Sequence, residues 1–210
     1  MKDLRKNYTA GELVEYNLPS SPFELFTQWF EDASNSDGIV EPNAMVLSTV
    51  NSDLEPDSRI VLLKDIRKEA FVFYTNYDSN KGQQIAHNGN CTLLFPWVNL
   101  ERQVIIRGFA SRVSEQESID YFNSRPKSSR IGAWASSQSN PIHSREDLEK
   151  QLKMVEAKYT GTDIPKPPHW GGFALDPREI EFWQGRPNRL HDRLVYRKNV
   201  GHWNTVRLQP

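Results

Sequence analysis

The chain has 210 residues, a formal net charge of −1 and one cysteine, Cys91. This length can bury a substantial core as one domain, and the near-neutral charge excludes the strong basic field that nucleic-acid-binding proteins carry. A cationic cluster in this chain therefore favours a small anionic ligand. A single cysteine excludes an internal disulfide and a cysteine metal cluster, and the hydrophobic neighbours of Cys91 predict a buried thiol.

Several other classes of protein are disfavoured by what the sequence lacks. No hydrophobic run approaches the ~20 residues of a membrane span and the start has no signal-peptide region, so we expect a cytoplasmic protein. The five histidines are scattered without metalloprotease spacing, and we expect no metal site. No Gly-x-Gly-x-x-Gly turn, P-loop or nucleophile elbow occurs, which argues against Rossmann-type nicotinamide binding, NTP binding and a serine hydrolase.

The first predicted elements are an arm and a helix. Residues 1–19 are polar and mixed, which predicts a mobile N-terminal arm unless the segment docks on the body. Residues 20–210 then form one domain. Ser21 and Pro22 are typical of a helix start, with Glu24 placed to close a capping box. Aromatic residues recur at helical spacing in this helix and predict core packing: Phe23, Phe26, Trp29 and Phe30.

Closely spaced β-type runs follow. They are rich in Val, Ile, Leu, Phe and Tyr, are separated by turn-prone segments, and cover residues 44–50, 58–64, 70–75, 91–97 and 102–113. One short helix is predicted among them, at 79–89. Few helices between many strands indicate an antiparallel barrel rather than a doubly wound sheet, and so a mainly β fold with peripheral helices.

The second half begins with helices and ends with strands. The sequence predicts helices at 114–125, with Ser114 and Glu117 in capping-box positions, at 130–136 and at 144–159. Prolines make residues 163–169 an extended connector. The last predicted strands cover residues 172–175, 179–184, 189–197 and 202–208.

The strand predicted at 189–197 carries the strongest functional signal. Side chains alternate along a strand, so Arg189, His191 and Arg193 would share one face, with Leu190, Leu194 and Tyr196 packing inward. Two guanidiniums and an imidazole form a donor-rich ledge suited to a phosphate or another anion. An ordinary solvated face is the alternative, and the nearby Trp183 favours a site.

Weaker cationic signals lie elsewhere. Arg59 and Lys64 flank an apolar strand and would point to opposite faces, where snorkelling is the simpler explanation. Ser79 and Lys81 begin a helix whose free amides suit a phosphate, although by themselves they are better explained by a plain N-cap. The stretch 125–130 allows the same two interpretations. Gln103 offers an amide for a heterocycle edge or for water.

Taken together, these segments resemble the pyridoxine/pyridoxamine 5′-phosphate oxidases in the same order along nearly the whole chain. The matching segments are Arg59 to Lys64, Phe73 to Asn76, Leu94 to Trp97, Glu101 to Val104, Tyr121-Phe122 with Ser124 to Pro126, Ile131 to Trp134, Trp170 to Phe173, Glu181 to Gly185 and Arg189 to Arg193. The combination is specific, although no single piece would be.

The resemblance implies a split-barrel homodimer with FMN held at the subunit interface. It also implies oxidation of pyridoxamine or pyridoxine 5′-phosphate to pyridoxal 5′-phosphate, with O2 reoxidising the flavin to release H2O2. Residues 170–210 would be the C-terminal strand segment that carries substrate and dimer contacts. The expected catalytic residues are Arg189 and His191, with the choice of proton carrier left open.

The resemblance also implies two sets of ligand contacts. The FMN contacts would be Arg59, Ile60, Val61, Leu62, Leu63, Lys64, Tyr74, Thr75, Lys81, Gln103, Gln138, Ser139, Trp183 and Arg193. The substrate contacts would be Arg5, Lys6, Asn7, Tyr8, Lys64, Tyr121, Arg125, Ser129, Arg189, Leu190 and His191. The first four belong to a mobile arm that closes over the substrate in this family.

One departure and two alternatives accompany this prediction. Asn80 stands where many members carry arginine, which weakens one expected phosphate contact. A phenazine-pathway flavin oxidase shares the barrel and the C-terminal pattern, but its precursors lack a phosphate for Tyr121, Arg125 and Ser129. A non-catalytic module that binds FMN or pyridoxal phosphate is the other alternative, and Arg189 with His191 argues against it.

Overall fold

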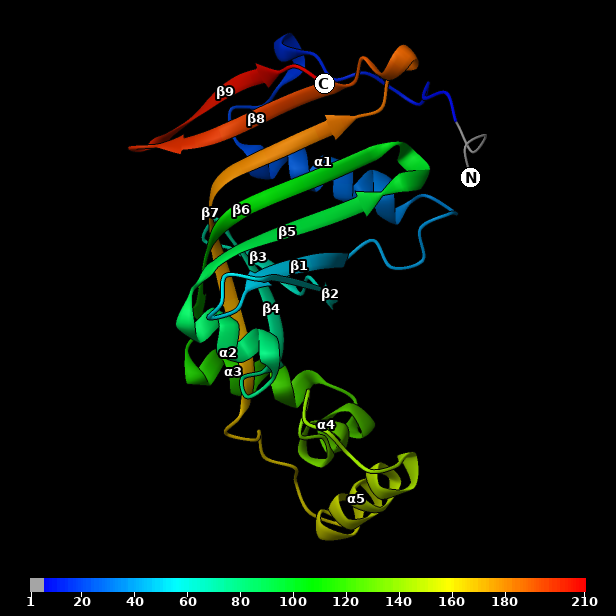
Figure 1. The fold of residues 1–210 in the computed structure, drawn as a ribbon, viewed down its shortest axis with the longest axis vertical. Coiled ribbons are helices and arrows are strands. Elements are labelled where there is room, and N and C mark those ends of the chain that lie inside the picture. Colours follow the sequence, from blue (N-terminus) through cyan, green and yellow to red (C-terminus); the bar gives the residue numbers. More distant parts are fainter. Residues whose placement is uncertain (1–5) are drawn as a thin grey trace.

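The computed structural model describes residues 6–210, which form a nine-stranded antiparallel sheet curved into a half-open barrel with five α-helices around it (Figure 1). Its strands are β1 (Ala44–Val50), β2 (Pro56–Leu62), β3 (Asp65–Arg67), β4 (Ala70–Asn76), β5 (Asn90–Trp97), β6 (Arg102–Arg112), β7 (Trp170–Gln184), β8 (Asp192–Asn199) and β9 (His202–Leu208). The sheet order is β2-β1-β5-β6-β7-β4-β3, with β8 on β7 and β9 on β8. The predicted mainly β barrel is therefore confirmed.

The helices are α1 (Pro22–Ser34), α2 (Asn80–His87), α3 (Glu115–Ser124), α4 (Lys127–Ala135) and α5 (Arg145–Lys158), with short 3-10 turns η1 (Glu15–Asn17), η2 (Val98–Leu100) and η3 (Pro187–Arg189). One helix, α1, packs on the inner face of the sheet, and the other four lie toward one end of it (Figure 1). The capping box at Ser114 and Glu117 is confirmed. The box predicted at α1 is wrong, because Ser21 Oγ accepts from the Phe23 amide and the Glu24 amide donates to the Ser21 carbonyl instead.

Strand β7 is the shared element of the fold. We predicted two strands here, at 172–175 and 179–184; the structure joins them into one strand of 15 residues. Pro177 is tolerated where the β6–β7 register shifts, opposite Gly108, since a bulge removes the need for its missing amide donor. A Cβ at Gly108 would lie 2.2 Å from the Asp176 carbonyl oxygen, so only glycine fits there.

Two hydrophobic clusters hold the fold together. The larger one fills the barrel, where the predicted stripe of α1 packs: Phe26 and Trp29 are buried, and Phe23 and Phe30 cover them. The smaller one joins α3, α4 and α5 to the start of β7. Cys91 lies in the larger cluster as predicted, and burial raises the pKa of its thiol to about 11. None of the helices described is long and apolar enough to cross a membrane.

The strand predicted at 189–197 is shorter than expected. Residues 187–189 form η3, with Asn188 and Arg189 at φ 57° and 61°, and β8 begins only at Asp192. Arg189, His191 and Arg193 therefore do not share a strand face, and Leu190 is exposed rather than packed inward. Leu194 and Tyr196 are buried as predicted. Pro187, which cannot donate to a sheet ladder, starts the turn in place of the strand.

Candidate functional site

A cavity of about 630 Å³ lies between β2, β4, α3 and α4, a size typical of small-molecule sites. We call it the cation-lined cavity. Its lining is Ile60, Val61, Leu62, Lys64, Tyr74, Thr75, Asn76, Lys81, Tyr121, Arg125, Pro126, Ser129, Gly132, Ala133, Ser136, Gln138 and Trp170. The structure thus brings together eleven of the predicted ligand contacts, which come from segments far apart in the sequence.

Among residues 6–210, three cations and no carboxylate line this cavity: Lys64, Lys81 and Arg125. Lys81 is buried, and its Nζ donates to Gln138 Oε1 at 2.9 Å and to Ser79 Oγ at 3.2 Å. Burial lowers the pKa of Lys81, and the positive charge of Arg59 lowers it further. Because neutral oxygens only partly compensate a buried ammonium, an anion entering the cavity would be stabilised here.

Arg125 stands at the opposite wall, on aromatic rings. Its guanidinium carbon lies 4.6 Å from the centre of the Trp170 ring, and its Nη1 is buried without a hydrogen-bond partner among the described residues. Burial lowers the pKa of this guanidinium and raises that of Tyr121 beside it. Tyr121 stacks on Tyr74 at 3.8 Å and 17°. The Arg125 guanidinium rests over the Trp170 and Phe122 rings, and its buried Nη1 is free to donate to a ligand.

Helix α4 presents a face of small side chains to the cavity. Ser129, Gly132, Ala133 and Ser136 line it at the i, i+3, i+4 and i+7 spacing of one helical face. A Cβ added to Gly132 would meet no protein atom within 4 Å. Protein packing therefore does not require this glycine, although glycine disfavours a helix interior. The prediction included Ser129 and missed the other three, which this spacing could have revealed.

Three predicted FMN contacts lie beside the cavity rather than on its wall. Arg59 donates to Leu47 O and Thr49 Oγ1, and its Nη2 pairs with Asp57 Oδ2 at 2.6 Å. Leu63 is buried in the barrel core. Ser139 Oγ accepts from the first amide of α2, that of Asn80, at 3.3 Å. Arg59 and Ser139 thus fix the α2 end of the cavity from outside.

A second group of predicted contacts forms a row across three strands. Gln103 on β6 lies opposite Trp183 on β7, which lies opposite Arg193 on β8. Directly paired residues project from the same face of a sheet, so these three side chains stand side by side. We call them the three-strand row. Arg193 Nη2 is held by the buried Glu181 carboxylate at 2.7 Å.

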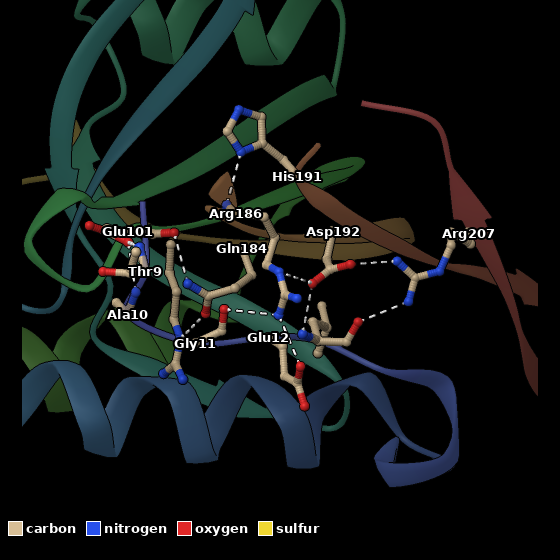
Figure 2. A network of polar contacts seen from close by, with 12 residues as sticks. Thr9, Ala10, Gly11, Glu12, Glu101, Gln184, Arg186, His191, Asp192 and Arg207 are labelled. Carbon is tan, nitrogen blue, oxygen red and sulfur yellow. Dashed lines mark hydrogen bonds and ion pairs between the residues drawn. The ribbon is translucent and has the colours of Figure 1, made fainter. Parts of the chain in front are cut away.

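His191 lies at the end of this row, with its ring centre 4.6 Å from that of Trp183. Its Nδ1 accepts a hydrogen bond from the Arg186 amide at 3.1 Å (Figure 2). Because Nδ1 accepts this bond, the other ring nitrogen, Nε2, is the one that can carry a proton and donate. Arg189 and Leu190 are exposed on the same turn.

The arm reaches the same place. The Tyr8 ring packs edge-on against Trp183, with centres 5.8 Å apart, and lies 5.6 Å from His191. Lys6 pairs with Glu101, and Asn7 is exposed. Arg5 falls outside the described residues. The arm's predicted mobility remains a prediction; its described part lies against β7 and β8.

The cation-lined cavity and the three-strand row stand at opposite ends of β7. Trp170 lines the cavity at the start of that strand, and Trp183 belongs to the row near its end. A strand rises about 3.3 Å per residue, so thirteen residues span roughly 40 Å of strand. Figure 1 shows β7 running the length of the sheet between these regions. The two groups of one chain therefore do not form one pocket.

Family models match most of the chain. Residues 34–159 match the pyridoxamine 5′-phosphate oxidase model, and residues 170–210 match the pyridoxine 5′-phosphate oxidase C-terminal dimerisation region. The chain is 53% identical to a pyridoxine/pyridoxamine 5′-phosphate oxidase of Gloeothece citriformis, over 99% of this chain and 97% of that one. A Rubrobacter xylanophilus protein of the same name is 50% identical, over 99% and 95%.

Solved structures agree with this assignment. PhzG from Burkholderia lata, solved with tetrahydrophenazine-1-carboxylic acid, is 30% identical with a TM-score of 0.88, covering 96% of this chain and all of that one. A pyridoxamine 5′-phosphate oxidase-related, FMN-binding protein from Nostoc punctiforme, 16% identical over 92% of this chain and all of that one, shares the fold with a TM-score of 0.73. The full-length identity of about half places the sequence firmly: this chain belongs to the pyridoxine/pyridoxamine 5′-phosphate oxidase family.

Proposed function

We propose that this protein is an FMN-dependent oxidase that converts pyridoxamine or pyridoxine 5′-phosphate to pyridoxal 5′-phosphate, with O2 as the electron acceptor and H2O2 as a product. Family membership and the names of relatives about 50% identical over the full chain support this reaction. The observation that carries the proposal is the cavity lined by Lys64, Lys81 and Arg125 without a carboxylate. Two phosphorylated ligands require this kind of wall.

The cavity fits FMN in its size and in its donors. At the α2 end, Lys81 offers a buried ammonium, and Thr75 and Gln138 provide polar atoms beside it. The apolar side chains of Ile60, Val61 and Leu62 on β2 form a wall for a flat ring. When bound, FMN supplies the hydride-accepting ring, and the protein supplies orientation and electrostatics.

The substrate phosphate belongs at the other end of the cavity. The unpartnered Nη1 of Arg125 offers a charge-assisted hydrogen bond, and the hydroxyls of Tyr121 and Ser129 stand on the same wall. Lys64 is exposed at the rim, where it adds a fourth donor. These groups fix one end of the substrate, so that its reacting carbon is held against the flavin ring.

We further propose that the three-strand row of one protomer completes the cavity of its partner in a homodimer. The match of residues 170–210 to a dimerisation region supports this assembly, as does the separation of the two groups along β7. Trp183 and Arg193 would then contact the flavin, and His191 Nε2–H would donate to a polar group of the substrate. Arg189, exposed on η3, would add a cation at the reacting end.

Aerobic turnover of the purified protein tests the reaction. We expect a yellow protein that releases FMN on denaturation and forms pyridoxal 5′-phosphate and H2O2 from either phosphorylated substrate. A protein that binds no FMN contradicts the cofactor. Bound FMN without product favours a binding module, and faster turnover of a dihydrophenazine or tetrahydrophenazine carboxylate than of both phosphates favours the activity suggested by the PhzG likeness.

A further inference from the structure

Four side chains of the body hold the arm segment, which we define as residues 6–15. They are Glu101, Arg186, Asp192 and Arg207, and Figure 2 shows them gathered along the path of the arm. All four contacts are hydrogen bonds to a charged group, which are stronger than those between neutral groups. The arm is therefore docked by electrostatics, with Tyr8 and Leu13 as its partly buried or buried apolar anchors.

Glu101 is the one residue of the body that forms the hydrogen bonds and ion pair described for residues 6–10. Its Oε1 pairs with Lys6 Nζ at 2.8 Å, and its Oε2 accepts from the amides of Thr9 at 2.7 Å and Ala10 at 2.9 Å. Every hydrogen bond and ion pair described for residues 6–10 ends on this one carboxylate. Glu101 is only 3% exposed. It directly follows η2, and its backbone is in the left-handed conformation, with φ 55°.

The charge on Glu101 is stable at neutral pH. Burial raises the pKa of its carboxyl, but the hydrogen bonds from Lys6, Ala10 and Thr9 lower it by more, so that it lies below its ordinary value. Three donors from one segment stabilise the charge of this buried carboxylate. Without that segment, the carboxylate would lack hydrogen-bond donors. The ionised Glu101 carboxylate and the docked position of residues 6–10 therefore depend on each other.

The second part of the arm is fixed by different groups. The buried Leu13 donates its amide to Asp192 Oδ2 at 3.0 Å, and its carbonyl accepts from Arg207 Nη2 at 2.9 Å. Arg207 also pairs with Glu15, which lowers the pKa of that carboxyl to about 2. Loss of the Glu101 contacts would leave these bonds intact, so residues 6–10 could move while residues 13–15 stay.

Tyr8 is the side chain that the Glu101 contacts place. Its ring fills the space left by Gly185, where an added Cβ would lie 2.8 Å from Tyr8 Cγ. It rests on Trp183 and His191, the groups that the proposed function assigns to flavin and substrate. Lys6 and Thr9 lie on either side of Tyr8 in the sequence, so one carboxylate fixes the chain before and after this ring.

We propose that Glu101 is a positioning residue, a latch that holds residues 6–10 so that Tyr8 closes against Trp183 and His191. The inference rests on the proposed function for the role of that wall. It assigns the latch to the body of the protein and not to the arm, and it separates a releasable part of the arm from a fixed part.

The test is amide hydrogen exchange on the FMN-loaded protein, together with substrate kinetics, for Glu101→Gln and Glu12→Gln. Glu12 pairs with Arg186 at 3.0 Å from an exposed position on the same arm, so its variant is a matched control. In Glu101→Gln we expect exchange at Thr9 and Ala10 to rise about tenfold or more, while Leu13 stays protected. The KM for substrate should rise about tenfold, with a smaller change in kcat and FMN retained.

Other outcomes overturn the latch. Unchanged exchange at Thr9 and Ala10, or equal loss at Leu13, contradicts the division of the arm, and lost protection with an unchanged KM contradicts the positioning role. Lys6→Met, which leaves the buried carboxylate in place, should give a weaker form of the same effects. The two proposals can be distinguished. If the wild-type protein shows no oxidase turnover but Glu101→Gln still loses protection at Thr9 and Ala10, the proposed function is wrong and the docking role of Glu101 is supported.

Discussion

Among single residues, Gly132 gives the sharpest test of the cavity. It lies inside α4, lines the cavity, and leaves open space where a Cβ would stand. Gly132→Ala should stabilise the helix by about 0.5–1 kcal/mol, because alanine loses less backbone entropy. The added methyl group should also occupy ligand space, and we expect the KM for the phosphorylated substrate to rise several-fold while Tm rises.

The control for that substitution is Ser128→Ala in the same helix. Ser128 is exposed and does not line the cavity, so its variant should raise helix stability without changing KM. Thermal unfolding and steady-state kinetics measure both effects. An unchanged KM for Gly132→Ala would mean that no ligand approaches this part of α4.

The buried thiol of Cys91 predicts that thiol labelling and folding stability depend on pH. Because the chain has one cysteine, the labelling can be assigned to this residue. Burial raises its thiol pKa to about 11 from an ordinary value of 9.0, so the folded protein holds little thiolate at pH 8. Iodoacetamide should therefore label the native protein far more slowly than the urea-unfolded one. Folding stability should fall between pH 9 and 11, because the unfolded thiol ionises first. Rapid labelling of the native chain would contradict this burial.

The sequence shows which residues carry charge, but not how that charge is compensated. Lys81 could be expected at a helix start from the Ser79 cap, and the structure places it in the cavity. Arg193 is held by Glu181, a cross-strand neighbour whose position depends on the β7–β8 register, which no local pattern specifies. Arg59 is similarly taken by Asp57 on its own strand. Local spacing therefore identified the cations. It could have identified a partner on the same strand, such as Asp57, but not one on a neighbouring strand, such as Glu181.

At the scale of elements, the Ser114 capping box supports the cavity from a distance. Ser114 Oγ accepts from the Glu117 amide at 3.2 Å, and Glu117 Oε2 accepts from the Ser114 amide at 2.8 Å. The box begins α3, which carries Tyr121 and ends at Arg125. Ser114→Ala should lower the free energy of unfolding by about 1 kcal/mol, measured by urea titration. Ser111→Ala, at an exposed position before the helix, is the control and should change it little.

Some strand boundaries followed the hydrophobic pattern, and others did not. The strand predicted at 58–64 is β2, at 56–62, and β3, at 65–67, was not predicted. The strands at 44–50 and 202–208 were predicted as the structure has them. Pro177 lies between two runs predicted as separate strands, and the bulge opposite Gly108 lets one strand continue through it. Pro187 begins a turn that the charge alternation from Arg189 to Arg193 concealed. A periodicity of two does not distinguish a strand from an extended loop. Whether a proline ends a strand depends on the strand paired with it, which the local sequence does not show.

At the scale of the whole molecule, the many short strands were enough to predict a barrel. They were not enough to predict that the ligand contacts fall into two separate regions, the cation-lined cavity and the three-strand row. The length of β7, which places Trp170 and Trp183 at opposite ends, follows from joining two predicted strands. Sequence order alone cannot show that the predicted ligand contacts belong to two separate regions. In the proposed homodimer, one chain supplies the cavity and its partner supplies the row.

Mixed dimers test this arrangement directly. Arg125→Ala damages the cavity and His191→Ala damages the region of the row, and each variant alone should lose most oxidase activity. In a mixed dimer, one site combines both defects and the other has neither. Random reassociation of equal amounts should therefore restore about a quarter of wild-type activity, because half the dimers are mixed and each has one intact site. Mixing Arg125→Ala with Lys64→Ala, two cavity variants, should restore none. Mass spectrometry of the mixture shows whether protomers have exchanged. If they have exchanged and the first mixture stays inactive, the cavity and the row do not meet across the dimer.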